Sequence, residues 1–339
     1  MVWMIGLVII LILVLFLPFS VKKVEHNLEI FLFVMGIAAA LVSGMMNLHL
    51  IEKALIDPIT ITLAVLIAGL VCKWGQVQLE KSILWVNRIL SPRIFFGLTV
   101  IILGLASSII TAIIAAIVLV IIINVLPLDR KSEIRFTVLA CFSIGLGAAL
   151  TPIGEPLATI TISKLNEDFF YLLKLIGPEV ISAVVILGIL TILLVKPQES
   201  TDGLTSEQKV ESYKEILIRS AKIYLFVMGL TFLGHGFEPL INEYILGLHP
   251  TLLYWINMIS AILDNATLAA AEISPAMDQS TIQAVLMGLI ISGGMLIPGN
   301  IPNIIAAGKL NITSKEWASF GVPVGLITMA VYFVILFVI

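Results

Sequence analysis

Acidic residues inside apolar segments are the first candidates for chemistry in this chain, above all Glu155 and Asp264. A carboxylate within a membrane is costly, so such residues usually serve ion pathways or proton relays. No Lys or Arg occurs within residues 136–163 or 250–308, so neither carboxylate has a basic partner in its own segment. A bound cation or a proton is then the natural counter-charge, and we predict Na⁺ binding at Glu155 and Asp264.

Each acidic residue also has a structural interpretation. Asp264 could cap the N-terminus of the helix that follows it, and capping is compatible with ion binding. Glu272 lies near the end of its apolar segment, where a solvated surface charge is the alternative to a functional role. These alternatives stay open at the level of the sequence.

Neutral polar residues accompany the carboxylates. Hydroxyl and amide oxygens, together with the carbonyls of unwound backbone, suit a hard monovalent cation. Taken singly, each such residue more often makes a helix–helix contact. Their concentration at four interruptions of the apolar segments predicts substrate or ion binding by Ser107, Ser108, Thr111, Thr151, Gly154, Asn265, Thr267, Asn300 and Asn303.

Two proline pairs predict where the helices that carry these residues are interrupted. The pairs are Pro152 with Pro156 and Pro298 with Pro302, and each encloses a glycine and a polar residue. One proline removes a single hydrogen bond and kinks a helix, whereas two so close together must unwind it. Unwound backbone at membrane depth is tolerated where it lines a cavity enclosed by protein. Broken helices in corresponding places of two halves point to the binding site of a secondary transporter.

The composition indicates a membrane protein and argues against several other classes. Of 339 residues, 60% are hydrophobic and 12% are charged, against roughly 25% charged in soluble domains. The apolar stretches are continuous and lack alternation, so they predict helices and not a β-barrel. The net charge of −3 leaves no basic field for nucleic acid. No HExxH motif or aspartate pair for an intramembrane protease is present, so we expect neither an enzyme nor a cofactor.

The apolar stretches predict an all-α polytopic membrane protein. Two stretches, 94–126 and 250–277, are interrupted near their middle, and each half is roughly 12–16 residues, short of the length that a crossing needs. We interpret both as re-entrant helical hairpins. The remaining stretches predict about eight transmembrane segments, of which 134–163 and 281–307 are broken: 2–20, 28–47, 58–73, 134–163, 169–195, 217–236, 281–307 and 316–338.

The basic residues orient these segments in the membrane. With the N-terminus outside, 16 of the 19 Lys and Arg residues fall in cytoplasmic loops, as the positive-inside rule requires. Both termini are then extracytoplasmic, and a multi-pass protein of the inner (plasma) membrane is expected.

The predicted order of segments divides the chain into two halves of opposite topology. Residues 1–57 form two N-terminal spans, 58–196 the first inverted repeat, 197–216 a cytoplasmic linker and 217–339 the second inverted repeat. The sequence Lys-Leu-Asn at 164–166 returns at 309–311, in keeping with this division. The sequence at 32–36 also matches that at 225–229. The predicted topology sends these two spans across the membrane in the same direction, so they cannot be inverted equivalents, and we interpret the match as coincidence.

The motifs resemble those of the ion transporter superfamily, which includes NhaD-type sodium/proton antiporters, arsenite permeases and dicarboxylate/sodium symporters. The stretch Ser260–Thr267 looks like the hairpin tip of NhaD-type members, and the broken stretches at 151–156 and 297–303 look like the superfamily's Gly/Pro/Asn loops. Within it the chain is similar to a small prokaryotic group named as cation transporters. The resemblance spans roughly residues 58–338 and implies an elevator-type mechanism and a homodimer. The first hairpin lacks the Asn that symporter relatives carry at its tip.

Three functions remain open. The first is exchange of Na⁺ or Li⁺ for protons, which the carboxylates favour because two negative charges would repel an anion. The second is transport of a small anion such as a dicarboxylate or arsenite, held by helix N-termini. The third is a membrane sensor or scaffold that transports nothing.

Overall fold

The computed structural model describes most of the chain. The described residues are 2–25, 27–59, 62–63, 66–67, 70, 73–74, 91–126, 128–197, 212–244, 248–263 and 265–338. Asp264, much of the predicted span 58–73 and most of the predicted linker 197–216 lie outside them.

The prediction of an all-helical chain is confirmed, because the described residues contain helices and no strand. The first part of the chain contains α1 (Val2–Ser20), α2 (Lys22–Glu25), α3 (Leu28–Val42), α5 (Pro92–Ile110), α6 (Ala112–Val125), α7 (Arg130–Ala148), α8 (Pro156–Leu165) and α9 (Tyr171–Leu194). The second part contains α10 (Tyr213–Tyr244), α11 (Pro250–Ile256), η1 (Asn257–Ala261), α12 (Asn265–Glu272), α13 (Gln279–Gly293), η2 (Ile297–Gly299), α14 (Ile301–Leu310) and α15 (Ser314–Phe337).

The helices are compatible with a membrane protein in both length and surface. Among the described residues, α5, α9, α10 and α15 are long and apolar enough to cross a bilayer, and α1, α3, α6 and α13 are shorter apolar helices. Large apolar side chains are exposed at helical spacing on α1, namely Ile5, Ile9, Ile12 and Phe16. Contiguous exposed apolar surface of this kind is rare on soluble monomers and suits contact with lipid.

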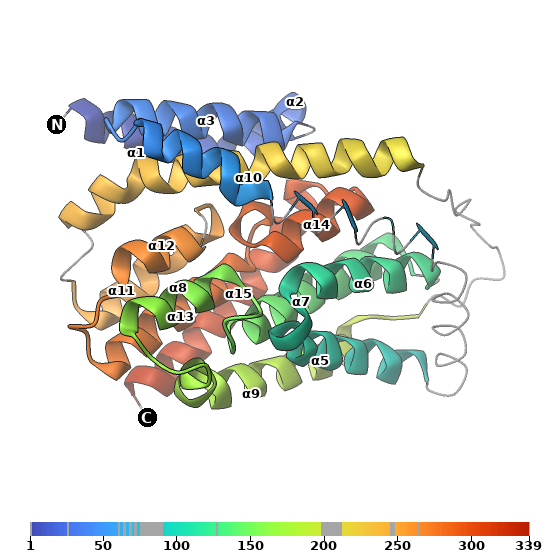
Figure 1. The fold of residues 1–339 in the computed structure, drawn as a ribbon. Helices are drawn as coiled ribbons and strands as arrows, with labels where there is room; N and C mark the ends of the chain where they lie inside the picture. Colours follow the sequence, from blue (N-terminus) through green and yellow to red (C-terminus); the bar gives the residue numbers. More distant parts are fainter. Residues whose placement is uncertain are drawn as a thin grey trace.

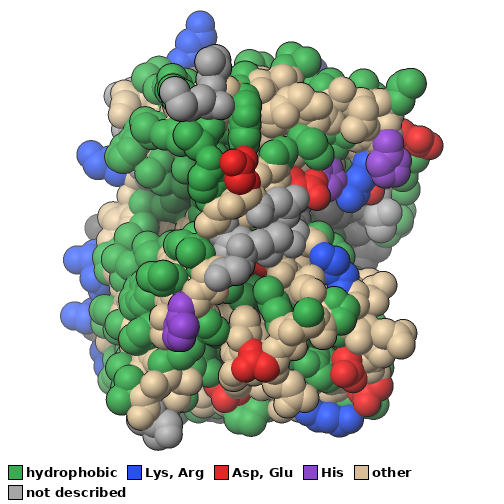
Figure 2. All heavy atoms as spheres, turned by 90° about the vertical axis from the view of Figure 1, so that its left-hand side faces the viewer, with side chains coloured by type: hydrophobic (Ala, Val, Ile, Leu, Met, Phe, Trp, Pro, Cys, Tyr) green, Lys and Arg blue, Asp and Glu red, His purple; other side chains and the backbone are tan. Residues whose placement is uncertain are grey.

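The two ends of the chain lie at the same end of the helix bundle (Figure 1). Figure 2 looks onto this end, where acidic, basic and histidine side chains interrupt the hydrophobic surface. The opposite end holds the start of α7 and of α15 (Figure 1). The structure does not contain a membrane, and the assignment of the two ends to its two sides stays a prediction.

The first predicted hairpin differs from expectation in the length of its first helix. The helix α5 has 19 residues, not 12–16, because Ser107 and Ser108 do not interrupt it. Their hydroxyls donate to the carbonyls of Gly104 and Leu105 in the preceding turn, at 2.6 and 2.7 Å, which serine can do without ending a helix. The interruption is confined to Thr111, between α5 and α6.

Two other predicted segments have different bounds. The helix α3 ends at Val42 rather than at 47, because Gly44 adopts a left-handed conformation with φ +74°, which glycine does at little cost. The helix α10 is longer than the predicted 217–236 at both ends.

The helices α3 and α10 pack side by side in an upper layer with α1 (Figure 1). Their contact is close: a Cβ atom on Gly36 would lie 2.3 Å from the carbonyl oxygen of Gly229, and one on Gly229 would lie 2.7 Å from the backbone nitrogen of Phe33. Small residues permit such an approach between helices. The matching sequences 32–36 and 225–229 therefore meet, and their glycines share one packing role.

We predict that Gly229→Ala destabilises the protein by about 1–3 kcal/mol, because the added methyl group would press on the backbone of α3. Gly308→Ala is the matched control, since no heavy atom lies within 4 Å of the position of its Cβ. That change should be neutral or stabilising by about 0.5–1 kcal/mol. Thermal unfolding in detergent measures both, and equal stability of the two variants would refute the tight α3–α10 contact.

Candidate functional site

The first proline pair lies where a helix is interrupted. The helix α7 ends at Ala148 and α8 begins at Pro156, and we call residues 149–155 the first break. A Cβ atom on Gly154 would lie 2.0 Å from the carbonyl oxygen of Ala148, so only glycine fits there. The chain therefore folds back against the end of α7 before α8 begins.

The first break is bound to the turn between α5 and α6, residues 107–112, which we call the first tip. The Thr151 hydroxyl donates to the carbonyl of Ser108 at 2.5 Å, and the backbone N–H of Ala112 donates to the carbonyl of Gly154 at 3.0 Å. These bonds satisfy backbone groups that the helix interruptions release, as burial requires. The first tip and the first break thus form one unit.

Thr111 gives the first tip its unusual shape. Its φ of +75° is rare for a β-branched residue and marks local strain of the kind found at functional sites. Its hydroxyl accepts from the backbone N–H of Ile114 at 3.4 Å and caps the start of α6. Next to it, Ser107 is fully buried, and its hydroxyl faces the carbonyls of Gly104 and Ile144 at 2.6 and 2.9 Å.

Glu155 is the acidic residue of the first break. It is only 7% exposed and occupies the N-cap position of α8, directly before Pro156. The N-terminus of a helix carries partial positive charge, so the Glu155 carboxyl group lies at the positive end of the α8 dipole. Sequence and structure thus agree in giving the first break a buried acidic group.

The second proline pair also lies where a helix is interrupted. The helix α13 ends at Gly293 and α14 begins at Ile301, and we call residues 294–300 the second break. The Asn303 amide donates to the carbonyls of Gly293 and Leu296 at 2.8 and 2.9 Å, and the Trp317 indole donates to the carbonyl of Gly294 at 3.1 Å. Asn303 is fully buried, and its side-chain oxygen has no hydrogen-bond partner among the described residues.

The second tip, which we define as residues 257–263 and 265, faces the second break. A Cβ atom on Gly299 would lie 2.8 Å from the carbonyl oxygen of Ser260, so the two segments touch through backbone. The Ser260 hydroxyl donates to the carbonyl of Leu289 at 3.1 Å. Asn265 begins α12, and its buried side-chain nitrogen has no hydrogen-bond partner among the described residues.

The structure does not fully describe two of the predicted site residues, Asp264 and Thr267. Asp264 lies between residues 263 and 265 of the second tip, outside the described residues. Thr267 lies on α12, and the position of its side chain is outside the description.

The second break contacts α7, the helix that leads into the first break. A Cβ atom on Gly145 would lie 2.2 Å from the side-chain nitrogen of Asn300, and one on Gly294 would lie 2.4 Å from the ring of Phe142. The helix α7 also packs against α13, and crosswise contacts join α6 to α14 and α8 to α12. The broken helices of the two halves therefore pack against each other.

The short helices that follow the two breaks have the same construction. Both α8 and α14 are ten residues long, carry proline in the first turn and have a lysine in the last turn. Both end on an asparagine in the left-handed conformation, Asn166 with φ 56° and Asn311 with φ 51°. The Lys-Leu-Asn sequences that match each other therefore occupy equivalent structural positions.

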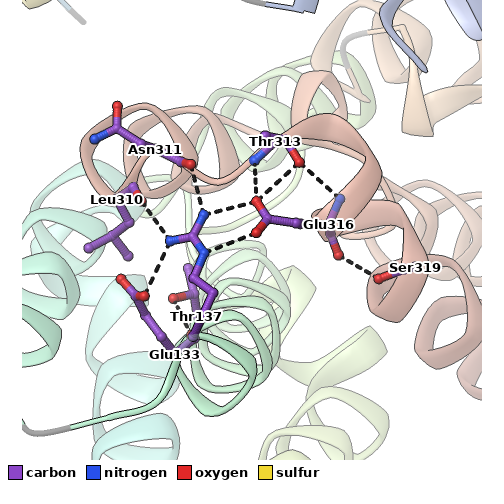
Figure 3. A network of polar contacts seen from close by, with 8 residues as sticks. Glu133, Thr137, Leu310, Asn311, Thr313, Glu316 and Ser319 are labelled. Atoms are coloured by element: carbon purple, nitrogen blue, oxygen red, sulfur yellow. Dashed lines mark hydrogen bonds and ion pairs between the residues drawn. The ribbon is translucent and has the colours of Figure 1, made fainter. Parts of the chain in front are cut away.

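Charged side chains hold the outer ends of these helices. The Arg130 guanidinium contacts both carboxylate oxygens of Glu316 at 3.0 and 2.9 Å and the carbonyls of Leu310 and Asn311 at 3.0 and 2.8 Å (Figure 3). It thereby joins α7, the end of α14 and the start of α15. Lys164 at the end of α8 donates to the carbonyls of Ala270 and Ile273, and these hydrogen bonds join α8 to the end of α12.

A cavity of about 280 Å³ leads toward the second break from the end of the molecule opposite the termini. An ion pair between Lys222 and Glu29, at 2.7 Å, lies in its wall, and Ile297 of the second break also lines it. The other lining residues are Leu28, Ile223, Phe226, Ile304, Ile305, Ala307, Gly308, Asn311, Ile312, Thr313 and Ser314.

Several polar residues of this region were not predicted as site residues. Asn257, Ser260 and Ser292 are fully buried and connect the second tip to α13. Glu272 is also fully buried, so its interpretation as a solvated surface charge is wrong. Among the described residues, no three His, Cys, Asp or Glu side chains lie close enough to hold a metal ion.

One protein-family model covers almost the whole chain. A family model described as "Protein of unknown function (DUF1646)" matches residues 4–339. The chain belongs to the DUF1646 family. No curated protein matches the sequence. The DUF1646 description assigns no activity to the family.

We predict that Asn303→Ala lowers the stability by about 1–3 kcal/mol, because the carbonyls of Gly293 and Leu296 would lose their donor in a buried place. Asn124→Ala is the control, since Asn124 is exposed on α6. Thermal unfolding in detergent should separate the two variants. A stability of Asn303→Ala equal to that of the control would show that these carbonyls do not depend on Asn303.

Proposed function

We propose that this protein is a secondary active ion transporter that exchanges Na⁺ or Li⁺ for protons. The observation that carries this proposal is the pairing of each buried break with a tip, through Thr151 and Ser108 in one half and through Gly299 and Ser260 in the other. A structural protein would gain nothing from two interrupted helices in its core. In transporters, such breaks expose carbonyls that bind ions.

The proposed ion site uses oxygen atoms of the breaks and tips. Glu155 and Asp264 supply negative charge, and Thr151, Asn300 and Asn303 supply neutral oxygens. Carboxylates, carbonyls and amide oxygens are the ligands of hard cations. The unpartnered side-chain oxygen of Asn303 supports this assignment, because a buried acceptor without a donor suits a cation.

We propose further that residues 58–196 and 217–339 are inverted repeats, each with a re-entrant hairpin and a broken transmembrane helix. The equivalent construction of α8 and α14 and the crosswise packing of α6 on α14 and α8 on α12 support this. On this proposal the tips and breaks move together, elevator-fashion, within a homodimer. The cavity that reaches Ile297 would then be the route from the cytoplasm to the site.

A small anion such as a dicarboxylate or arsenite is the second candidate substrate. The start of α14 favours it, because Asn300 is neutral and its side chain makes no capping hydrogen bond there. The partial positive charge of that helix N-terminus is thus available to an anion. Glu155 at the start of α8 favours a cation over an anion, since its negative charge offsets the positive end of the α8 dipole.

We predict that purified protein in proteoliposomes dissipates an imposed pH gradient when Na⁺ or Li⁺ is added. Glu155→Gln and Asp264→Asn should each abolish this exchange, because they remove the charge for which cation and proton compete. Glu167→Gln, at an exposed position after α8, should keep it.

Exchange at the wild-type rate in Glu155→Gln and Asp264→Asn would exclude these carboxylates from the mechanism. A protein that responds to no cation would contradict antiport, and uptake of labelled dicarboxylate or arsenite would then test the second candidate. Absence of all transport, with no thermal stabilisation by ions, would favour a sensor or scaffold.

The orientation gives a separate prediction. In a variant without Cys72 and Cys141, a cysteine introduced by Lys131→Cys should be protected from a membrane-impermeant thiol reagent in intact cells. A cysteine introduced by Glu167→Cys should react, because α8 ends at the opposite end of the molecule. The reverse pattern would invert the proposed topology.

A further inference from the structure

Glu272 is a buried acidic group that the proposed ion site does not use. It is the last residue of α12 and has no exposed surface. Neither of its carboxylate oxygens has a hydrogen-bond partner among the described residues. An ionised carboxylate buried in this way is very costly, and such a group normally neutralises or acquires a partner.

Asn257 of η1 is the polar neighbour of Glu272. The segment η1 packs against α12, and the Asn257 carboxamide lies beside the Glu272 carboxyl group without meeting hydrogen-bond geometry. The Asn257 nitrogen donates instead to the carbonyl of Val285 at 3.4 Å. A proton on Glu272 would remove the buried negative charge that no partner compensates.

Among the described side chains of the surrounding elements, no charged group pairs with Glu272. The helix α12 packs against α8, α10, α13 and η1, and neither α13 nor η1 contains an ionisable side chain. Lys164, the only charged residue of α8, is bound to the backbone carbonyls of Ala270 and Ile273. On α10, the His235 Nδ1 lies 3.5 Å from a carboxylate oxygen of Glu238, so these two side chains face each other. The position of Glu272 at a helix C-terminus also disfavours a negative charge.

A hydrogen bond connects Asn257 to the helix that leads into the second break. The Ser292 hydroxyl donates to the backbone carbonyl of Asn257 at 2.7 Å, and Ser292 lies in the last turn of α13. Asn257 is one helical turn before Ser260, which contacts Gly299. Movement of the second tip against α13 and the second break would therefore change the surroundings of Asn257 and Glu272.

We propose that Glu272 is a proton-binding site on the helix that follows the second tip. In the present conformation the Glu272 carboxyl group holds a proton, which removes the buried negative charge. When the second tip moves and water reaches the site, the O–H bond breaks and the proton passes to that water, leaving the carboxylate. The coupling of this step to ion exchange rests on the proposed function, whereas the presence of the proton does not.

Infrared difference spectroscopy of the purified full-length protein tests this proposal without requiring transport. We expect a carbonyl-stretch band of a buried, protonated carboxylic acid at acidic pH that is lost at alkaline pH. Glu272→Gln should remove the band, and Glu167→Gln, an exposed control, should retain it. Asn257→Ala should shift the frequency of the band, because the polar side chain beside the carboxyl group is gone. This second variant keeps the test valid if Glu272→Gln does not fold.

Three results would overturn the proposal. A band unchanged in Glu272→Gln would mean that Glu272 is ionised throughout. A band that persists at every pH would mean a permanently neutral carboxyl group. Loss of the band at constant acidic pH on adding NaCl, but not choline chloride, would assign the site to Na⁺ instead. A failure of pH-gradient dissipation with the expected spectrum would contradict the proposed antiport and leave the proton site standing.

Discussion

Satisfaction of backbone polar groups is the constraint on which the rest of this structure depends. An interrupted helix releases N–H and C=O groups that neither lipid nor an apolar core can bind. Here the released groups are bound from neighbouring segments, by Thr151 and Gly154 at the first break and by Asn303 and Trp317 at the second. The first tip and the first break bind each other, whereas side chains of α14 and α15 bind the second break. These bonds let irregular backbone persist inside an apolar bundle.

Close glycine contacts make these bonds geometrically possible. Gly147 lies so near the carbonyl of Gly104 that a Cβ atom there would be 1.8 Å from its oxygen, which brings α5 onto α7 beside the first break. In the second half, Gly293 and Gly299 approach each other's backbone in the same way. The breaks are thus flanked by tightly packed helices, and Arg130 and Lys164 fix the ends of the helices that follow or adjoin the breaks.

The sequence predicts the interruptions well because proline and glycine act locally. Pro156 and Pro302 each lie in the first turn of the helix after a break, where the missing N–H costs nothing. The roles of Asn257 and Trp317 were not predictable, since their partners on α13 are distant in sequence and known only from packing. The prediction that Ser107 and Ser108 interrupt the first hairpin was wrong for the opposite reason. Their local pattern suggested a break, but their hydroxyls donate to carbonyls of the preceding turn and α5 stays intact. Only Thr111 interrupts the chain there.

The most direct test of this account asks whether a cation binds at the breaks themselves. Hydrogen–deuterium exchange of the backbone amides can be compared in NaCl and in choline chloride at equal ionic strength. We expect Na⁺ to slow exchange in residues 149–155, 294–300 or both, with α9 unchanged. Identical exchange in the two salts, or protection confined to α1, α3 and α10, would contradict the claim that the broken helices form an ion site.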